Sequence, residues 1–413
     1  MDDQLQSNEI PPFKGAAVFI AGLGVISAIG NNVAESLDAL ISGNAGIEAM
    51  KRLNSIHKDE LPVAEVKLTN EALADLAQLP LHISRTALLS TVAAKEALDN
   101  SGIDITRWRT GFISANSVGG MDKTEDFFDD FLQNPNAGHL RSVVNHECGT
   151  VTEITANALG IKDFVTTVST ACSSSANSIF LGARLIRQNR LDVVVAGGAD
   201  ALTRFTLNGF NTLMILDNQY CQPFDDNRRG LNLGEGAGYV VLVSEKVAAT
   251  LADTPSVTIS GWANANDAHH QTASSPEGKG NLLAMKGALQ KAGLQPAEID
   301  YINLHGTGTN NNDIAEGTAI KTLFDGNYPS MSSTKSFTGH TLGASGGIEA
   351  VFSALAIQEG MIFPNLRFET PMKELPFRPV TELRKAAVKN VMSNSFGFGG
   401  NCSSLVFSKY IAR

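Results

Sequence analysis

Three residues of two types that support acyl-transfer chemistry stand far apart along this chain of 413 residues: Cys172, His305 and His340. A thiolate attacks a thioester and also leaves from one readily, and an imidazole N–H donates to an oxygen on which negative charge develops. Glycines beside both histidines allow other backbone to come close. A lone cysteine is usually an inert, buried residue, but one cysteine and two histidines in such settings form a candidate catalytic set.

The elements around Cys172 are expected to activate its sulfur. A β-branched run at 164–168 predicts a buried strand, and small and apolar residues at helical spacing predict a helix over 174–188. Cys172 then lies on a strand-to-helix turn, where the free N–H groups and the positive end of the helix dipole favour thiolate over thiol. The sequence therefore predicts a nucleophilic cysteine.

The histidines are also expected at the ends of regular elements. A strand at 299–304 leads to His305, a helix at 345–358 begins just after His340, and strands at 388–392 and 404–407 flank a glycine-rich turn at 396–400. Gly22 and Gly24 are expected to turn the chain sharply after a first strand. The other expected elements are helices at 32–42, 84–101, 150–160, 281–292 and 313–324 and strands at 17–21, 110–115, 191–199, 240–244 and 257–262.

These motifs, in this order, resemble the β-ketoacyl-[acyl carrier protein] synthases, most closely the class II elongation type. The likeness runs from Ile20 through Gly400, nearly the whole chain. It implies an α/β, thiolase-like fold with a duplicated, five-layered α-β-α-β-α arrangement. The N-terminal half, 1–250, would carry Cys172, and the C-terminal half, 251–413, would carry both histidines.

The resemblance implies a decarboxylative Claisen condensation, in which an acyl thioester loaded on Cys172 reacts with malonyl-acyl carrier protein. The chemistry needs two imidazole donors. The resemblance implies that Lys335 orients the site electrostatically, and a general base is the alternative role. The implied catalytic residues are Cys172, His305, His340 and Lys335, and the implied supporting residues are Glu349 and Glu316, either of which would pair with Lys335, and Asp313.

Further residues are implied to hold the substrate. The backbone N–H groups of Cys172 and Phe398 would form an oxyanion hole, with Gly397 and Gly399 giving the Phe398 gate its freedom. Val118 would line the acyl tunnel, although a plain core valine is the alternative reading. The residues implied to bind pantetheine are Thr307, Thr309, Asp267, His270 and Thr272.

Composition excludes several other classes of function. A formal charge of -10 argues against binding nucleic acid, which needs a basic face. The polar, acidic start of the chain and the lack of a long apolar run predict neither a secretory signal nor a membrane span. Four cysteines without paired spacing predict no disulfide framework and no metal site, so we expect a cytoplasmic protein.

The resemblance also implies the partners. They are the acyl carrier protein, whose phosphopantetheine arm takes the place of a permanently bound cofactor, and a second subunit, which is a second copy or a homologous chain-length factor. Two other classes of protein are alternatives. A non-catalytic chain-length factor would lack the nucleophile, and a degradative thiolase would use a second cysteine, for which Cys402 is the candidate.

The chain departs from the family pattern at four places, and these favour a specialised polyketide or polyene pathway over housekeeping fatty acid synthesis. Ser175 adds a hydroxyl where glycine is common, so the resemblance does not determine the shape of the acyl pocket. The departures are at Asp163-Phe164, Ser173 to Ser175 with Asn177, Arg229, and Asn401-Cys402.

Overall fold

A mixed sheet of ten strands organises the computed structural model, which describes residues 16–411. Its first five strands, in spatial order, are β3 (Phe164–Val168), β2 (Thr110–Ala115), β4 (Val193–Asp200), β5 (Gly236–Ser244) and β1 (Val18–Ser27). The other five are β6 (Val257–Asn266), β12 (Asn401–Lys409), β11 (Asn390–Gly397), β7 (Tyr301–Asn303) and β8 (Ser330–Ser332). The two groups meet through one residue pair, Phe19 of β1 with Thr258 of β6. The sheet is therefore two five-stranded halves joined at a single point.

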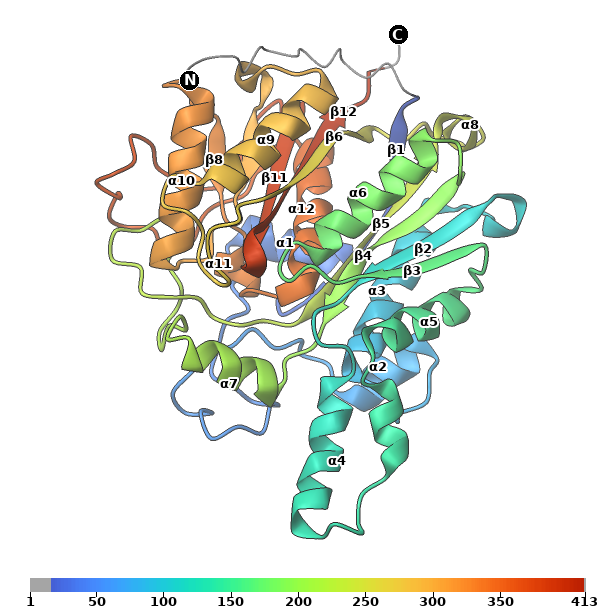
Figure 1. Cartoon of the computed structure of the whole chain (residues 1–413). Coiled ribbons are helices and arrows are strands. Elements are labelled where there is room, and N and C mark those ends of the chain that lie inside the picture. The colour runs from blue at the N-terminus through green and yellow to red at the C-terminus, as the bar shows by residue number, and fades with distance from the viewer. Residues whose placement is uncertain (1–15, 412–413) are drawn as a thin grey trace, which may run out of the picture.

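Helices fill the space between the two halves and cover their outer faces (Figure 1). The inner helices α6 (Ser174–Arg187) and α12 (Ser345–Glu359) contact strands of both halves and each other. Outside, α3 (Arg85–Ser101) and α5 (Cys148–Leu159) cover the first half, and α9 (Lys279–Ala292) and α10 (Asn310–Phe324) cover the second. This confirms the predicted five-layered, thiolase-like arrangement.

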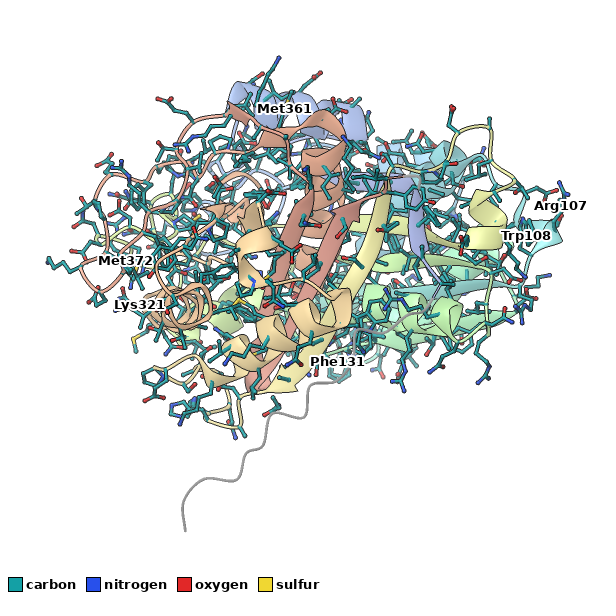
Figure 2. The ribbon with its side chains drawn as sticks, turned by 90° about the horizontal axis from the view of Figure 1, so that it is seen from above. Arg107, Trp108, Phe131, Lys321, Met361 and Met372 are labelled. Carbon is teal, nitrogen blue, oxygen red and sulfur yellow. The ribbon has the colours of Figure 1, made fainter. Side chains whose placement is uncertain are left out.

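The inner layer is the most deeply buried part of the chain. Thirteen of the residues of α12 are buried, among them Ile348, Val351 and Phe352, and apolar residues of α6 join the same core. A helix that is apolar all round is typical of such an internal position. Seen from above, the two halves extend to opposite sides, with Lys321 and Met372 on one flank and Arg107 and Trp108 on the other (Figure 2).

Capping residues mark the starts of two of the expected helices. The Asn32 side chain accepts from the N–H of Glu35 at the start of α1 (Val33–Ser42), which ends at Gly43 with φ of 74°. Ser84 caps α3 in the same way. The remaining elements are α2 (Asn70–Ala77), α4 (Met121–Gln133), α7 (Arg204–Thr212), α8 (Glu245–Ala248), α11 (Lys335–Thr338), β9 (Met361–Ile362), β10 (Arg384–Lys385) and five short 3₁₀ turns, Ile105–Arg107, Leu140–Asn145, Pro296–Glu298, Leu342–Ala344 and Phe398–Gly400.

Two expectations about strands were wrong. The chain does not turn at Gly22 and Gly24, because β1 continues through them to Ser27. These glycines allow close packing of α3, since a Cβ added at Gly22 would lie 2.0 Å from the carbonyl oxygen of Ala97. The strand before Cys172 is not buried, because β3 is the edge of the sheet and Val165 is 37% exposed.

Helix α4 projects from the body of the molecule together with the segment that follows it (Figure 1). Every residue of α4 is at least partly exposed, including Phe128 at 52% and Leu132 at 66%. Large exposed apolar groups on one element are typical of a contact surface for another protein. Among residues 16–411, no helix combines the length and the apolar character that a membrane crossing requires.

Candidate active site

One pocket of about 310 Å³ receives side chains from both halves of the sheet. Cys172 enters it from the turn between β3 and α6, His305 from the end of β7, and His340 from the turn after α11. The structure therefore brings together the three residues that the sequence singled out. The other lining residues are Phe210, Leu213, Met214, Ile215, Arg229, Leu231, Thr272, Ala273, Ser274, Thr307, Thr309, Asn310, Asn311, Asn312, Phe396, Gly397, Phe398 and Gly400.

Cys172 sits on a tight turn that points its sulfur into this pocket. Ala171 before it has φ of 54°, a left-handed conformation that costs a non-glycine residue about 1–2 kcal/mol. Burial raises the pKa of the Cys172 thiol to about 11, although the charge of Lys335 and the N–H of Phe398 favour the thiolate. Burial therefore works against the thiolate that the turn was expected to favour.

The glycine-rich loop between β11 and β12 lies directly against the nucleophile. A Cβ added at Gly397 would lie 3.1 Å from the backbone nitrogen of Cys172, so glycine permits this approach. The N–H groups of Cys172 and Phe398 both face the cysteine sulfur. The Phe398 ring stacks on Phe210 of α7, with 5.5 Å between centroids. Two backbone donors and an aromatic lid therefore meet at the sulfur.

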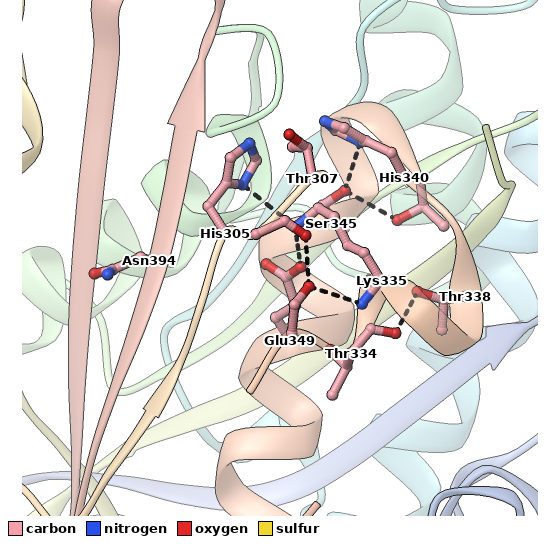
Figure 3. Close-up of polar contacts among 12 residues, drawn as sticks. His305, Thr307, Thr334, Lys335, Thr338, His340, Ser345, Glu349 and Asn394 are labelled. Atoms are coloured by element: carbon pink, nitrogen blue, oxygen red, sulfur yellow. Dashed lines mark hydrogen bonds and ion pairs between the residues drawn. The ribbon is translucent and has the colours of Figure 1, made fainter. Parts of the chain in front are cut away.

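In both histidines Nδ1 is engaged by the protein, which leaves Nε2 for the pocket. The Nδ1 of His340 accepts from the N–H of Leu342 at 3.0 Å, and the Nδ1 of His305 lies 3.3 Å from Nζ of Lys335 (Figure 3). Each Nδ1 is thus an acceptor, so the proton of each neutral ring is on Nε2. Burial and the Lys335 charge hold the pKa of both rings well below the usual value. The site therefore offers two neutral N–H donors, on rings 5.4 Å apart.

A buried ion pair lies behind the histidines. Lys335 opens α11, Glu349 belongs to α12, and the ammonium contacts the Oε1 of the carboxylate (Figure 3). The side chains are only 2% and 3% exposed. Burial raises the pKa of Glu349 to about 7, and Lys335 works against this rise. The pair keeps the Lys335 ammonium in a fixed, buried position beside His305.

Glu316 and Asp313 shape the turn that carries His305. The Glu316 carboxylate accepts from the N–H of His305 at 2.9 Å and of Gly306 at 2.8 Å, and Asp313 accepts from the N–H of Thr307 at 3.1 Å. Glu316 was expected as a possible partner of Lys335, but its oxygens are used by this backbone. Burial raises the pKa of Glu316 to about 7.

The residues expected to bind pantetheine divide into two groups. Thr272, Thr307 and Thr309 line the pocket, and the two hydroxyls of the latter pair are 2.9 Å apart. Asp267 instead accepts from the N–H of Ser275 at 2.6 Å, and His270 is exposed at the surface, so neither lines the pocket.

Val118 and Gly399 also lie outside the lining of this pocket. Val118 is half-buried in the loop before α4, and the N–H of Gly399 donates to the carbonyl of Gln271 at 2.7 Å. Phe210 and Phe396 line the pocket and were missed. Their position depends on contacts between distant segments, so no local pattern marks them.

Several of the departures from the family pattern meet in one hydrogen-bond network behind Cys172. The Oδ1 of Asn401 accepts from Ser173 Oγ at 2.8 Å, from Asn177 Nδ2 at 3.0 Å and from Asn264 Nδ2 at 2.6 Å. Asn401 directly follows the glycine-rich loop, so this network ties the loop to the helix that Cys172 precedes. Ser173, Asn177 and Asn401, three residues that depart from the family pattern, are therefore in direct contact.

Two other expectations concern cysteines and metals. Cys402 is 1% exposed, and its Sγ lies 3.1 Å from Oδ1 of Asn281 and outside the pocket. The placement gives no support to a second catalytic cysteine. In the part of the chain that the structure describes, no cluster of three or more His, Cys, Asp or Glu side chains is arranged to hold a metal ion.

Comparisons with known proteins cover nearly the whole chain. Two family models match, the beta-ketoacyl synthase N-terminal domain over residues 16–248 and the beta-ketoacyl synthase C-terminal domain over 257–369. A 3-oxoacyl-[acyl-carrier-protein] synthase 2 of Coxiella burnetii is 34% identical over 95% of this chain and 98% of its own length. The enzyme of the same name from Staphylococcus aureus is 33% identical over 96% and 99%.

Solved structures give the same result. The ishigamide ketosynthase/chain length factor superposes with a TM-score of 0.92 and 29% identity, over 96% of this chain and 100% of the matched chain. A beta-ketoacyl synthase from Burkholderia phymatum superposes with a TM-score of 0.85 and 26% identity, with the same coverage.

Proposed function

The chain belongs to the beta-ketoacyl synthase family, as its sequence predicted, and on this basis we propose that it is an acyltransferase that extends an acyl chain by decarboxylative condensation. The observation that carries the proposal is the meeting of Cys172, His305 and His340 in one pocket. The acyl donor and the malonyl donor are both thioesters of an acyl carrier protein. Their phosphopantetheine arms are substrate, and no permanently bound cofactor is required.

In the first half-reaction the acyl group moves to Cys172. The sulfur attacks the thioester carbonyl, a C–S bond forms, and the bond to the arm breaks. The thiol proton of Cys172 ends on the departing pantetheine sulfur, so the step is balanced without an external base. The N–H groups of Cys172 and Phe398 hold the oxyanion that forms in between.

In the second half-reaction the malonyl carrier loses carbon dioxide. Negative charge then moves to its thioester oxygen, where the Nε2–H groups of His305 and His340 both donate. The resulting enolate carbon attacks the acyl group, a C–C bond forms, and the bond to the Cys172 sulfur breaks. Cys172 leaves as a thiolate and then takes a proton from solvent. Removing one donor from a comparable site typically costs about 100- to 1000-fold in rate.

Neutral imidazoles suit this role, because a hydrogen-bond donor is needed and a proton transfer is not. The buried Lys335 charge keeps His305 neutral and its Nδ1 occupied, which makes Lys335 a positioning residue with Glu349 as its partner. Thr307, Thr309 and Thr272 offer hydroxyls to the amides of the arm. Val118, Asp267 and His270 have no such contact to support them as ligands of the substrate.

We also propose that the working enzyme is a dimer. Strand β3 lies at the edge of the sheet and could pair with a second subunit. Large apolar side chains are exposed on β3 and α4, among them Phe128, Leu132 and Val165. The second subunit is another copy or a chain-length factor, and the latter is favoured by the similar ishigamide ketosynthase/chain length factor structure. A chain-length factor as partner would favour a specialised pathway.

The four unpaired cysteines fit a cytoplasmic protein.

The division into units 1–250 and 251–413 belongs to the same proposal. It is supported by the single residue pair between β1 and β6 and by the limits of the two family models.

Incubation with acyl carriers of graded chain length, followed by intact mass measurement, tests the function. Wild-type protein should gain one acyl group, and the Cys172→Ala variant should gain none. His340→Ala should be acylated normally but release carbon dioxide from malonyl carrier at least about 100-fold more slowly. Acylation that persists in Cys172→Ala would refute the assignment.

A further inference from the structure

Arg229 stands out among the residues that line the Cys172 pocket. Within the described part of the chain, it is the only lining residue with a permanently charged side chain. That side chain is 47% exposed, so it lies where the pocket opens to solvent. The lining residues from Thr272 to Ser274 and from Thr309 to Asn312 are uncharged. A single cation therefore marks the mouth of a neutral pocket, in a chain whose net charge is -10.

The backbone around Arg229 is held firmly in place. The N–H of Leu231 donates to the carbonyl of Ile215 at 2.9 Å, and the N–H of Asp217 donates to Leu231 at 2.8 Å. Gly230 permits this close pairing, since a Cβ there would lie 2.6 Å from the oxygen of Ile215. The direction in which Arg229 leaves the backbone is thus fixed.

The guanidinium is also held by a buried acid. Its Nη2 donates to the Oδ1 of Asp217 at 2.8 Å, and the Asp217 side chain is only 1% exposed. Among residues 16–411, this is the one hydrogen bond that Arg229 makes through its side chain. A guanidinium has five N–H donors, so four of them make no hydrogen bond to residues 16–411.

The proposed function determines what arrives at this mouth. A pantetheine arm that brings a thioester to Cys172 carries its phosphodiester at the other end, which must stay outside the narrow part of the pocket. We propose that Arg229 binds this phosphodiester and so selects phosphorylated arms. Guanidinium groups pair with phosphate through several N–H donors at once. Arg229 is a specificity-determining residue here, and it takes no part in bond making.

The test compares two thioesters that differ only in the phosphate, acyl-4′-phosphopantetheine and acyl-pantetheine. The rate of Cys172 acylation is followed by intact mass for wild type, Arg229→Gln, Arg229→Lys and the matched control Arg190→Gln. Arg190 is exposed and lies outside the pocket. Wild type and the control should be acylated roughly 3- to 10-fold faster by the phosphorylated compound. This range corresponds to an interaction stronger than an exposed ion pair and weaker than a charge-assisted hydrogen bond.

Arg229→Gln should lower the rate with acyl-4′-phosphopantetheine more than the rate with acyl-pantetheine and so remove this preference, and Arg229→Lys should keep part of it. The preference should also shrink between 50 and 500 mM salt, values chosen to change the screening length by roughly threefold. A preference that survives in Arg229→Gln, or an equal loss with both compounds, would overturn the role of Arg229 while leaving the proposed condensing function intact. Failure of wild type to be acylated by either compound or by an acyl carrier protein would overturn both.

Discussion

Removal of the Lys335 charge should destabilise the protein in a way that depends on pH. In Lys335→Met the carboxylate of Glu349 stays buried without its cation, and its Oε2 already has no partner among the described residues. Breaking a buried pair in this manner costs about 3–5 kcal/mol.

The cost follows from the titration of Glu349. Burial already raises its pKa to about 7 with Lys335 present, and loss of the cation raises the pKa further. A carboxyl whose pKa is higher in the folded than in the unfolded chain loses stability as pH rises toward the folded value. Each pH unit in that window is worth about 1.4 kcal/mol. Wild type itself should lose about 0.8 kcal/mol between pH 6.5 and 8.5, because its Glu349 titrates near the middle of this interval. The variant, which loses about 2.7 kcal/mol, should therefore lose about 2 kcal/mol more than wild type.

Denaturant unfolding at these two pH values, at fixed protein concentration, measures the effect. The matched control is Lys335→Met with Glu349→Gln, which buries no charge and should lose much less stability at both pH values. Both variants should lose malonyl decarboxylation, because neither keeps the cation beside His305. Equal stability of the single and double variants at pH 8.5 would refute the idea of a buried, mutually dependent pair.

Two further predictions concern pH. Because burial raises the pKa of Cys172 to about 11, its alkylation by iodoacetamide should accelerate nearly tenfold per pH unit between pH 7 and 9, and a plateau below pH 8 would contradict this. His305 and His340 are buried with lowered pKa, so the unfolded chain takes up protons first as pH falls. Between pH 7.5 and 5.5 the free energy of unfolding of wild type should fall by about 1.4 kcal/mol per histidine more than that of a His305→Gln, His340→Gln double variant. Denaturant unfolding of both proteins in parallel measures the difference.

The parts of the fold that depend on neighbouring residues could be predicted from the sequence. The caps at Asn32 and Ser84 and the left-handed Gly43 are local signals, and the helices they bound were expected correctly. The role of Gly22 was not, because its reason is the backbone of a helix some 75 residues away. A strand pattern such as 164–168 also cannot distinguish an interior strand from an edge, since that depends on which strands pair.

The candidate site could likewise be predicted only in part. The motifs around Cys172, His305 and His340 identified the chemical groups, and the resemblance placed them in one pocket. The electrostatics needed the structure, because the helix that follows Cys172 can be predicted from the sequence, whereas the burial that raises the pKa of its thiol cannot. Phe210 was missed for a related reason, since only the folding of α7 over the glycine-rich loop brings it to Phe398.

The placement of the catalytic groups in two halves of the chain has a consequence for synthesis. A ribosome releases the segment with Cys172 well before it has made His340, and the loop with Phe398 comes later still. A growing or prematurely terminated chain therefore has a thiol but no partners for it, and cannot consume malonyl units. The full set of pocket groups exists only after the residues of the last strands, β11 and β12, have been made.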